Sequence, residues 1–338
     1  MPKTRVRGRA TGLALVPVLA LGWAVAAGGA AVADQSAAGA GAAGTAATAA
    51  AARGGGGMRP VEGSVAVGGA ERTYAGELPR GRSVPVVVAL HGKGSSPRDM
   101  AETTGLTEAA AEEGLGVVYP AGLHGGWGDH REPTALRPDP EADMDFLRAL
   151  VAELVAEHGA DPDRVYLAGQ SNGANMALRA AAEEPGLFAA VASVAGQLGA
   201  VPEPQEPEGG VPLLYVYGTA DPLRPYAGLP DPPAPSPDFP EPPIASISAP
   251  ATVEAFARAA GAEEGRTRRL PDRDPGDGTR VDLTHWRTDD DGRQVAFYRV
   301  AGGGHSWPGG STRHADVQGP ISQDFSAADA IAEYFAAH

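Results

Sequence analysis

The chain of 338 residues contains no cysteine. A cysteine nucleophile, a thiolate metal site and the lipid anchor of a lipoprotein are therefore excluded, and any exported form depends on its core rather than on disulfide bonds. Positive charge is also scarce. Lysine and arginine together number 27 against 42 aspartate and glutamate residues, and the formal net charge is −15. Such an excess of acid disfavours nucleic acid and anionic membranes as partners.

The N-terminal segment carries four of the basic residues within its first nine positions, followed by an apolar run at 13–27 and a small-residue triplet ending at Ala33. A basic segment, an apolar segment and an A-x-A site in this order predict a secretory signal peptide, residues 1–33, cleaved after Ala33. An uncleaved membrane anchor is the alternative, because 10–33 is long enough to span a bilayer. Cleavage would leave a net charge of −19, which suits an exported protein that acts on neutral substrates.

The rest of the chain divides into a linker and one domain. Residues 34–57 are mainly alanine, glycine and threonine, so they predict a flexible linker. Residues 58–338 fit a single domain. Strands are predicted at 61–67, 71–78, 84–90, 115–119, 165–168, 189–194, 213–217 and 295–300. Helices are predicted at 99–113, 143–158, 172–183, 251–260 and 326–337. This alternation predicts an α/β fold with a mostly parallel central sheet and helices on both faces.

One segment interrupts the alternation. Residues 229–243 contain eight prolines and no periodic apolar pattern, so we expect an extended loop. The loop follows the strand at 213–217, which places it near the mouth of any site at that edge of the sheet. A neutral surface insertion is an equally good reading. Asp143 and Asp145, at the start of a helix, are interpreted as partners of the helix dipole rather than as metal ligands.

The pentapeptide Gly169-Gln170-Ser171-Asn172-Gly173 has the form G-x-S-x-G. The bare pattern says little in a chain with 47 glycines, but here it lies between a predicted strand and a predicted helix. Glycines on both sides of the serine remove Cβ atoms that would clash in so tight a turn. The start of the helix also presents backbone N–H groups where an oxyanion would form. Ser171 is therefore the predicted nucleophile.

A serine hydroxyl needs a base, and in sites of this kind an acid and then a histidine follow the serine along the chain. Asp221 comes shortly after the strand at 213–217, and His305 follows the strand at 295–300 and three glycines. We expect Asp221 to orient His305. We expect His305 to take the proton of Ser171 and later to give it to the leaving alcohol.

The turn after the strand at 84–90 reads HGKG at 91–94. In sites of this kind the second donor of the oxyanion hole comes from this loop. The predicted donors are the backbone N–H groups of Lys93 and Asn172. His91 lies at the fixed end of a strand, so we expect it to support the loop rather than to act as a base.

With these residues identified, the chain resembles the secreted polyhydroxybutyrate depolymerase and feruloyl or acetylxylan esterase family of α/β-hydrolases. The resemblance rests on LHGKGSS, DPDRVYLAGQSNGANMALR, YGTADPLRPY, GGGHSWPGG and ISQDFSAADAIAEYF. It implies the α/β-hydrolase fold and a serine esterase that needs no cofactor and no metal. The implied substrates are small or oligomeric esters of hydroxyalkanoates, or feruloyl and acetyl esters. Lys93 departs from the family pattern, in which cysteine is common beside the oxyanion loop.

Three aromatic residues, Trp127, Tyr226 and Trp307, are the predicted substrate wall, because they lie close in sequence to the ends of the site strands. Packing of the loops is an equally good reading for each of them. Two other functions remain open at this point. A prolyl-oligopeptidase-like serine peptidase shares the same turn and the same order of acid and histidine. A non-catalytic exported binding protein on this scaffold is the other alternative. No nucleic acid partner is expected, and no membrane partner after cleavage of the signal peptide.

Overall fold

The computed structural model describes residues 57–338, except 202, 237–239, 290–291 and 313–314. The predicted signal peptide, and the predicted linker apart from its last residue, lie outside this part of the chain. Within it, no helix is both long enough and apolar enough to cross a membrane.

The strands of the described residues join into one eleven-stranded sheet. They are β1 (Met58–Val67), β2 (Ala70–Pro79), β3 (Val84–Leu90), β4 (Gly116–Pro120), β5 (Ala160–Gln170), β6 (Val191–Val194), β7 (Leu213–Gly218), β8 (Glu263–Glu264), β9 (Arg268–Arg269), β10 (Arg280–Arg287) and β11 (Arg293–Ala301). Their order across the sheet is β1-β2-β4-β3-β5-β6-β7-β11-β10-β8, and β9 also pairs with β10.

The middle of the sheet is parallel and its margins are antiparallel. Strands β4, β3, β5, β6, β7 and β11 pair in parallel, neighbour to neighbour. The β1–β2 hairpin extends one margin and β10 the other. Central strands are covered on both faces, which explains the unbroken apolar run of β3, whose residues 86–90 are fully buried. The predicted α/β fold with a mostly parallel sheet is confirmed.

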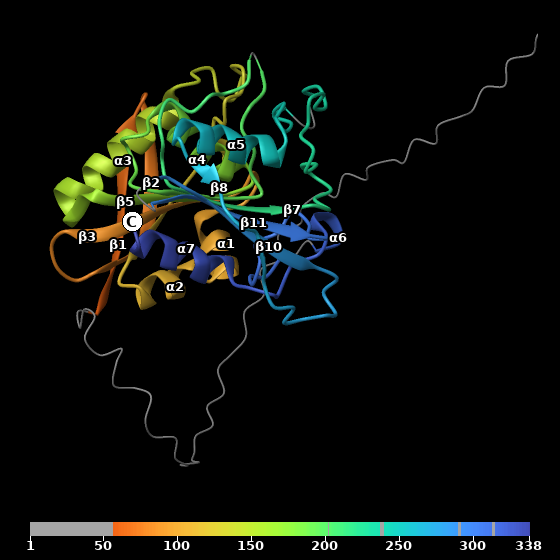
Figure 1. Ribbon diagram of the computed structural model, residues 1–338. Helices are drawn as coiled ribbons and strands as arrows, with labels where there is room; N and C mark the ends of the chain where they lie inside the picture. Colours follow the sequence, from red (N-terminus) through yellow and green to blue (C-terminus); the bar gives the residue numbers. More distant parts are fainter. Residues whose placement is uncertain (1–56, 202, 237–239, 290–291, 313–314) are drawn as a thin grey trace, which may run out of the picture. The chain divides into compact units, whose positions relative to one another are not determined.

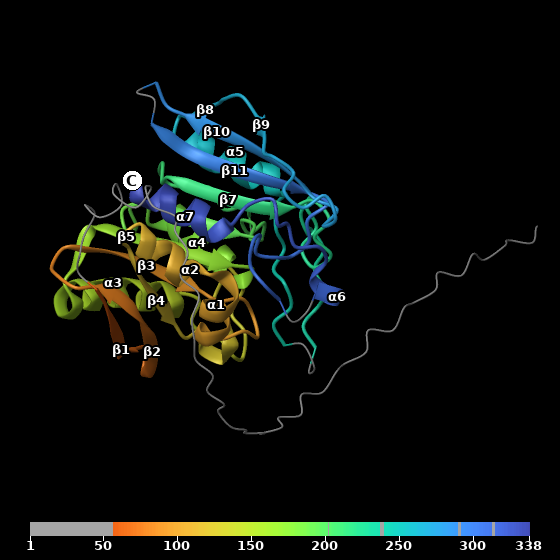
Figure 2. The same ribbon diagram turned by 90° about the horizontal axis from the view of Figure 1, so that it is seen from below.

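Helices cover both faces of the sheet (Figures 1 and 2). They are α1 (Pro97–Thr104), α2 (Leu106–Glu112), α3 (Ala142–His158), α4 (Asn172–Glu183), α5 (Ala249–Ala259), α6 (Ala315–Gln318) and α7 (Ala327–Ala336), with a 3-10 turn at Leu123–Gly125. In Figure 1, α3, α4 and α5 lie on one face and α1, α2 and α7 on the other. Each face has its own apolar core, one including Phe146 of α3 and the other Ile331 of α7.

One predicted helix differs from the structure, and the strands β8, β9 and β10 and the short helix α6 were not predicted. The helix predicted at 99–113 is two helices, because Gly105 has a φ of 68° and ends α1. Strand β10 was not predicted, although Val281 and Leu283 alternate with polar residues in the manner of a half-buried strand. The described residues of 229–243 contain no helix and no ladder strand, as predicted, and Leu229 makes only an isolated bridge with Ser246.

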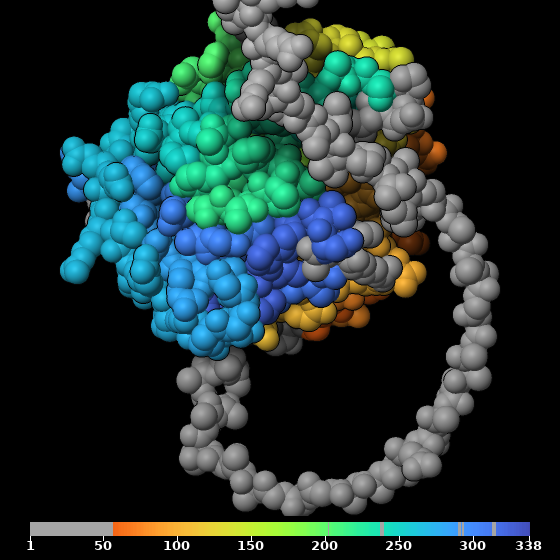
Figure 3. Space-filling model, turned by 90° about the vertical axis from the view of Figure 1, so that its right-hand side faces the viewer, coloured from red at the N-terminus to blue at the C-terminus, as the bar shows by residue number. Residues whose placement is uncertain are grey.

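The topology brings three chain segments to one edge of the sheet. Strands β5, β7 and β11 are all parallel, so their carboxyl ends lie at the same edge. Ser171 follows β5, Asp221 follows β7 and His305 follows β11. In the space-filling view of Figure 3, the green segment that follows β7 adjoins the blue segment that follows β11.

Candidate active site

Ser171 lies in a strained turn between β5 and α4. Its φ of 55° and ψ of −118° are rare for any residue but glycine, and its N–H donates to Val194 O at 2.9 Å. The flanking glycines make room for the turn. A Cβ at Gly169 would lie 2.2 Å from the carbonyl oxygen of Gly173, and one at Gly173 would lie 2.3 Å from Leu90 O. The turn is the one that the G-x-S-x-G pattern predicted.

The side chains of Ser171, His305 and Asp221 form one continuous chain of hydrogen bonds. His305 Nε2 is 2.7 Å from Ser171 Oγ, and His305 Nδ1 is 2.7 Å from Asp221 Oδ2. An ionised carboxylate only accepts, so Nδ1 carries the proton and donates to Asp221. Nε2 is then the acceptor for the hydroxyl proton of Ser171. Asp221 and His305 are both buried, which holds this arrangement out of bulk water.

Backbone groups hold the acid and the base in place. Asp221 Oδ1 accepts hydrogen bonds from the N–H groups of Leu223 at 2.8 Å and Arg224 at 2.7 Å. The N–H of His305 donates to Gln318 O at 2.6 Å. Because both residues are held by the main chain, the distance between them depends little on side-chain freedom.

The loop after β3 lies against the side chain of Ser171. A Cβ at Gly92 would be only 3.4 Å from Ser171 Cβ. Lys93 is the next residue of that loop, and Asn172 directly follows the serine. Within the described part of the chain, neither the N–H of Lys93 nor that of Asn172 has a hydrogen-bond acceptor. The two predicted oxyanion donors are therefore available to a ligand.

His91 supports this loop, as predicted. Its Nδ1 is 2.9 Å from Gly92 O, and its Nε2 accepts the N–H of Gly122 at 3.0 Å. Because Nε2 accepts, the proton lies on Nδ1, which donates. Burial lowers the pKa of His91, which keeps the ring neutral. Its role is to connect the loop after β3 to the loop after β4.

Trp127 is a core residue, so its predicted place in the substrate wall is wrong. The ring is fully buried, is stacked 6.4 Å from that of Phe146, and its Nε1 donates to His91 O at 2.9 Å. The backbone of Trp127, by contrast, is hydrogen-bonded to the side chain of Asn172. Asn172 Oδ1 accepts its N–H at 2.7 Å and Asn172 Nδ2 donates to its O at 3.0 Å, which fixes the residue after the nucleophile.

The other two aromatic candidates have different surroundings. Trp307 is only 3% exposed and belongs to the core on the α7 face, so its predicted place in the substrate wall is wrong as well. Proximity to His305 in sequence does not turn a ring toward the solvent. Tyr226 is half-buried, meets the ring of Tyr217 edge-on at 6.0 Å and lies under the guanidinium of Arg299 at 5.9 Å. None of these contacts joins Tyr226 to the triad, so its contact with substrate stays a prediction.

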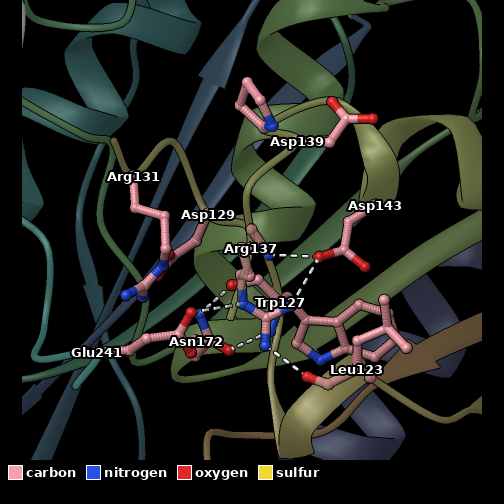
Figure 4. A network of polar contacts seen from close by, with 12 residues as sticks. Leu123, Trp127, Asp129, Arg131, Arg137, Asp139, Asp143, Asn172 and Glu241 are labelled. Atoms are coloured by element: carbon pink, nitrogen blue, oxygen red, sulfur yellow. Dashed lines mark hydrogen bonds and ion pairs between the residues drawn. The ribbon is translucent and has the colours of Figure 1, made fainter. Parts of the chain in front are cut away.

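Glu241, which sequence reasoning missed, ties the proline-rich loop to the oxyanion loop. Its carboxylate is ion-paired with Lys93 Nζ, lies 3.1 Å from Arg137 Nε and accepts from Thr134 Oγ1 at 3.0 Å (Figure 4). Burial by itself would raise the pKa of Glu241, but the hydrogen bond from Lys93 and the charge of Arg137 outweigh it and lower the pKa. Glu241 therefore stays ionised, and it joins its own part of the segment 229–243 to the loop after β3.

The same network continues through Arg137 to α3. Arg137 donates to Leu123 O at 2.5 Å and to Asp143 at 3.2 Å, and Asp143 also pairs with Arg72 at 2.8 Å (Figure 4). Asp143 does lie in the first turn of α3, but its main partners are these two buried arginines. No group of three histidine, aspartate or glutamate side chains suited to hold a metal ion occurs among the described residues.

Comparisons with known proteins identify the family of the chain. The family model described as "Putative esterase" matches residues 69–233. A "Putative esterase NocK" of Nocardia uniformis subsp. tsuyamanensis is 42% identical over 280 residues, 80% of each chain. Feruloyl esterase B of Neurospora crassa is 32% identical over 113 residues, 33% of this chain and 38% of that enzyme.

Among solved structures, an acetyl xylan esterase from Aspergillus awamori shares the fold, with a TM-score of 0.50 at 16% identity over 76% of this chain and 96% of that one. The α/β-hydrolase architecture and the long match to an esterase lead to the same assignment. The chain belongs to the esterase family of α/β-hydrolases, and its activity is the hydrolysis of ester bonds.

Proposed function

We propose that the chain is an exported serine esterase that hydrolyses carboxylic esters through an acyl-enzyme formed on Ser171. The observation that carries the proposal is the hydrogen-bonded chain from Ser171 through His305 to Asp221, with 2.7 Å at both links. The reaction as proposed uses neither a metal nor a cofactor. Export rests on the signal-peptide pattern of the first 33 residues.

In the first half of the reaction, Ser171 Oγ attacks the ester carbonyl while His305 Nε2 takes its proton. Asp221 stabilises the resulting imidazolium and keeps its Nδ1 proton aimed at the carboxylate. The N–H groups of Lys93 and Asn172 bind the oxyanion of the tetrahedral intermediate. As the intermediate collapses, the C–O bond to the alcohol breaks and His305 gives its proton to the leaving oxygen.

In the second half, His305 takes a proton from water, whose oxygen attacks the acyl-enzyme carbonyl. Collapse of this second intermediate breaks the bond to Ser171 Oγ, which recovers its proton from His305. The free acid leaves and the enzyme is restored. The same two N–H donors serve both intermediates, because the carbonyl carbon remains attached to Ser171 throughout.

The proposed substrates are hydroxyalkanoate oligomers or feruloyl and acetyl esters. The sequence resemblance supports this range, and so does the partial match to feruloyl esterase B. Loop shape decides between such esters more than the fold does. A panel of methyl ferulate, acetylated xylan and hydroxybutyrate oligomers measures the preference directly.

The test of the mechanism is Ser171→Ala with 4-nitrophenyl acetate and butyrate as substrates. We expect kcat to fall by at least about 10³-fold, because the nucleophile is lost, while the circular dichroism spectrum stays the same. Retained activity would rule out Ser171 as the nucleophile. A parallel assay on aminoacyl anilides tests the peptidase alternative, and we expect no cleavage of these amides.

A further inference from the structure

Four arginines are buried in the described part of the chain, and one of them lacks a hydrogen-bonded partner. Arg72, Arg137 and Arg179 each donate to a carboxylate. The guanidinium of Arg224 has no hydrogen-bond acceptor among the described residues, and its Nη1 is buried without any partner. Its ion-pair contact there is with Asp129, whose Oδ2 is 3.8 Å from Nη2. That separation is too long for a hydrogen bond.

Asp129 is already engaged by other groups. Its Oδ1 accepts from Arg131 Nε at 2.8 Å, and its Oδ2 accepts from Asn175 Nδ2 at 3.0 Å. One carboxylate thus faces two arginines, Arg131 and Arg224, whose side chains are 9% and 5% exposed. A buried cation without a hydrogen-bonded counter-ion is unfavourable. An anion that bound Arg224 would relieve the imbalance.

Arg224 lies beside the proposed catalytic residues. The backbone N–H of Arg224 donates to Asp221 Oδ1 at 2.7 Å. Asn175, which donates to Asp129, also donates its backbone N–H to Ser171 O at 3.0 Å. Figure 4 shows Asp129 and Arg131 in the same region as Asn172. The guanidinium therefore lies between the turn of the catalytic acid and the first turn of α4.

From these contacts we infer that Arg224 anchors a carboxylate of the substrate, so that the preferred esters carry a free carboxylate near the scissile bond. The inference rests on the proposed function and specifies its substrate class. A carboxylate presents two acceptor oxygens to the planar guanidinium, and exclusion of water strengthens such a charge-assisted bond. The net charge of −19 expected after signal-peptide cleavage led to an expectation of neutral substrates, but the guanidinium of Arg224, which lacks a hydrogen-bond acceptor among the described residues, points the other way.

The first experiment compares two esters with the same acyl chain, 4-nitrophenyl hydrogen glutarate and methyl 4-nitrophenyl glutarate. At about 0.15 M ionic strength, where distant surface charges are screened, we expect kcat/KM of the wild type to be at least tenfold higher for the acid. In Arg224→Met the preference should disappear, because KM for the acid should rise to the level of KM for the methyl ester. Arg258→Met, which removes an exposed arginine of α5, should keep the preference.

The second experiment measures binding without turnover. Glutarate should bind to the Ser171→Ala protein in calorimetry, and dimethyl glutarate should bind at least tenfold more weakly. Equal kcat/KM of the wild type for the acid and the methyl ester would overturn the inference. Equal affinity for glutarate and dimethyl glutarate would do the same, and both results hold even if Arg224→Met failed to fold. Hydrolysis of both nitrophenyl esters at one rate would leave the proposed esterase function intact. If neither ester were hydrolysed but glutarate still bound, the proposed esterase function would be contradicted and the proposed carboxylate site would stand.

Discussion

Lys93 and Glu241 are ion-paired although 148 positions separate them in the chain. Lysine occurs only at positions 3 and 93 of the sequence, so Lys93 is the one lysine in the described part. Its backbone N–H is a proposed oxyanion donor, and its side chain reaches into the proline-rich loop. The pair thus connects the loop that contacts Ser171 to the proline-rich segment.

Glu241→Gln tests this connection, since the change preserves shape and removes the charge. Lys93 loses its counter-ion and Arg137 loses one of its two, so we expect the free energy of unfolding to fall by about 3 kcal/mol. We expect kcat for 4-nitrophenyl acetate to fall about tenfold, with a smaller change in KM, because the oxyanion loop loses a support. Urea unfolding and initial rates measure the two effects.

The matched control is Glu206→Gln. Glu206 pairs with Arg258 on the surface, where both side chains are about two-thirds exposed. Its replacement should change the free energy of unfolding by less than about 0.5 kcal/mol and leave kcat unaltered. Equal effects of the two variants would show that the buried ion pair has no special part in the site.

Gly169→Ala tests the space available at the strand-to-helix turn. The new Cβ would lie 2.2 Å from the carbonyl oxygen of Gly173, a backbone atom that cannot move aside without shifting α4. We expect soluble yield to drop sharply, and any folded fraction to lose at least about tenfold in kcat. Gly186→Ala is the control, since nothing lies within 4 Å of its Cβ position. A Gly169→Ala protein as active as Gly186→Ala would refute the packing argument.

Trp127→Ala separates a core role from a substrate role. Loss of the buried ring should reduce the free energy of unfolding by about 3–5 kcal/mol, because the cavity beside Phe146 is only partly refilled. The hydrogen bonds of its backbone with Asn172 remain possible, and the ring is fully buried, so the ratio of acetate to butyrate hydrolysis should stay constant. A changed ratio of acetate to butyrate hydrolysis at an unchanged free energy of unfolding would instead show that the ring contacts the substrate.

His91 makes stability depend on pH. Burial lowers its pKa, so as pH falls below about 6.5 the unfolded chain takes up a proton that the folded ring does not yet bind. The free energy of unfolding therefore decreases in this range. His91→Asn lacks this contribution, so the stability advantage of the wild type should be larger at about pH 7.5 than at about pH 5.5. Urea unfolding at both values measures it, and an equal advantage at both would contradict the assignment.

The strand-to-helix turn and the positions of the triad residues could be predicted, because each depends on a short stretch of sequence. The turn at Ser171 follows from two glycines between a strand and a helix, and Asp221 and His305 follow from their positions after apolar strands. Parallel strands then bring these residues to one edge of the sheet without any further information. For the same reason the α/β architecture could be predicted, and β10 could have been included from its alternation of apolar and polar residues.

Contacts between distant segments could not be predicted in this way. Glu241 is one of three acids in the proline-rich segment, and nothing near it in sequence indicates the partners Lys93 and Arg137. Arg224 follows Asp221 closely in sequence. The lack of a hydrogen-bond acceptor for its guanidinium among the described residues, however, depends on Asp129, whose oxygens already accept from Arg131 and Asn175. Trp127 lies close in sequence to the end of a strand, which suggested a place in the substrate wall, but its ring packs in the core instead. Side-chain direction is decided by packing across the whole fold.

At position 171, activity and stability favour different residues. Its φ of 55° with ψ of −118° costs a serine on the order of 1–3 kcal/mol, whereas glycine adopts such angles readily. A glycine at position 171 would therefore relax the turn and abolish the nucleophile at once. Screening random variants for heat resistance alone would favour this inactive protein, so any engineering of this enzyme must select for turnover together with thermal tolerance.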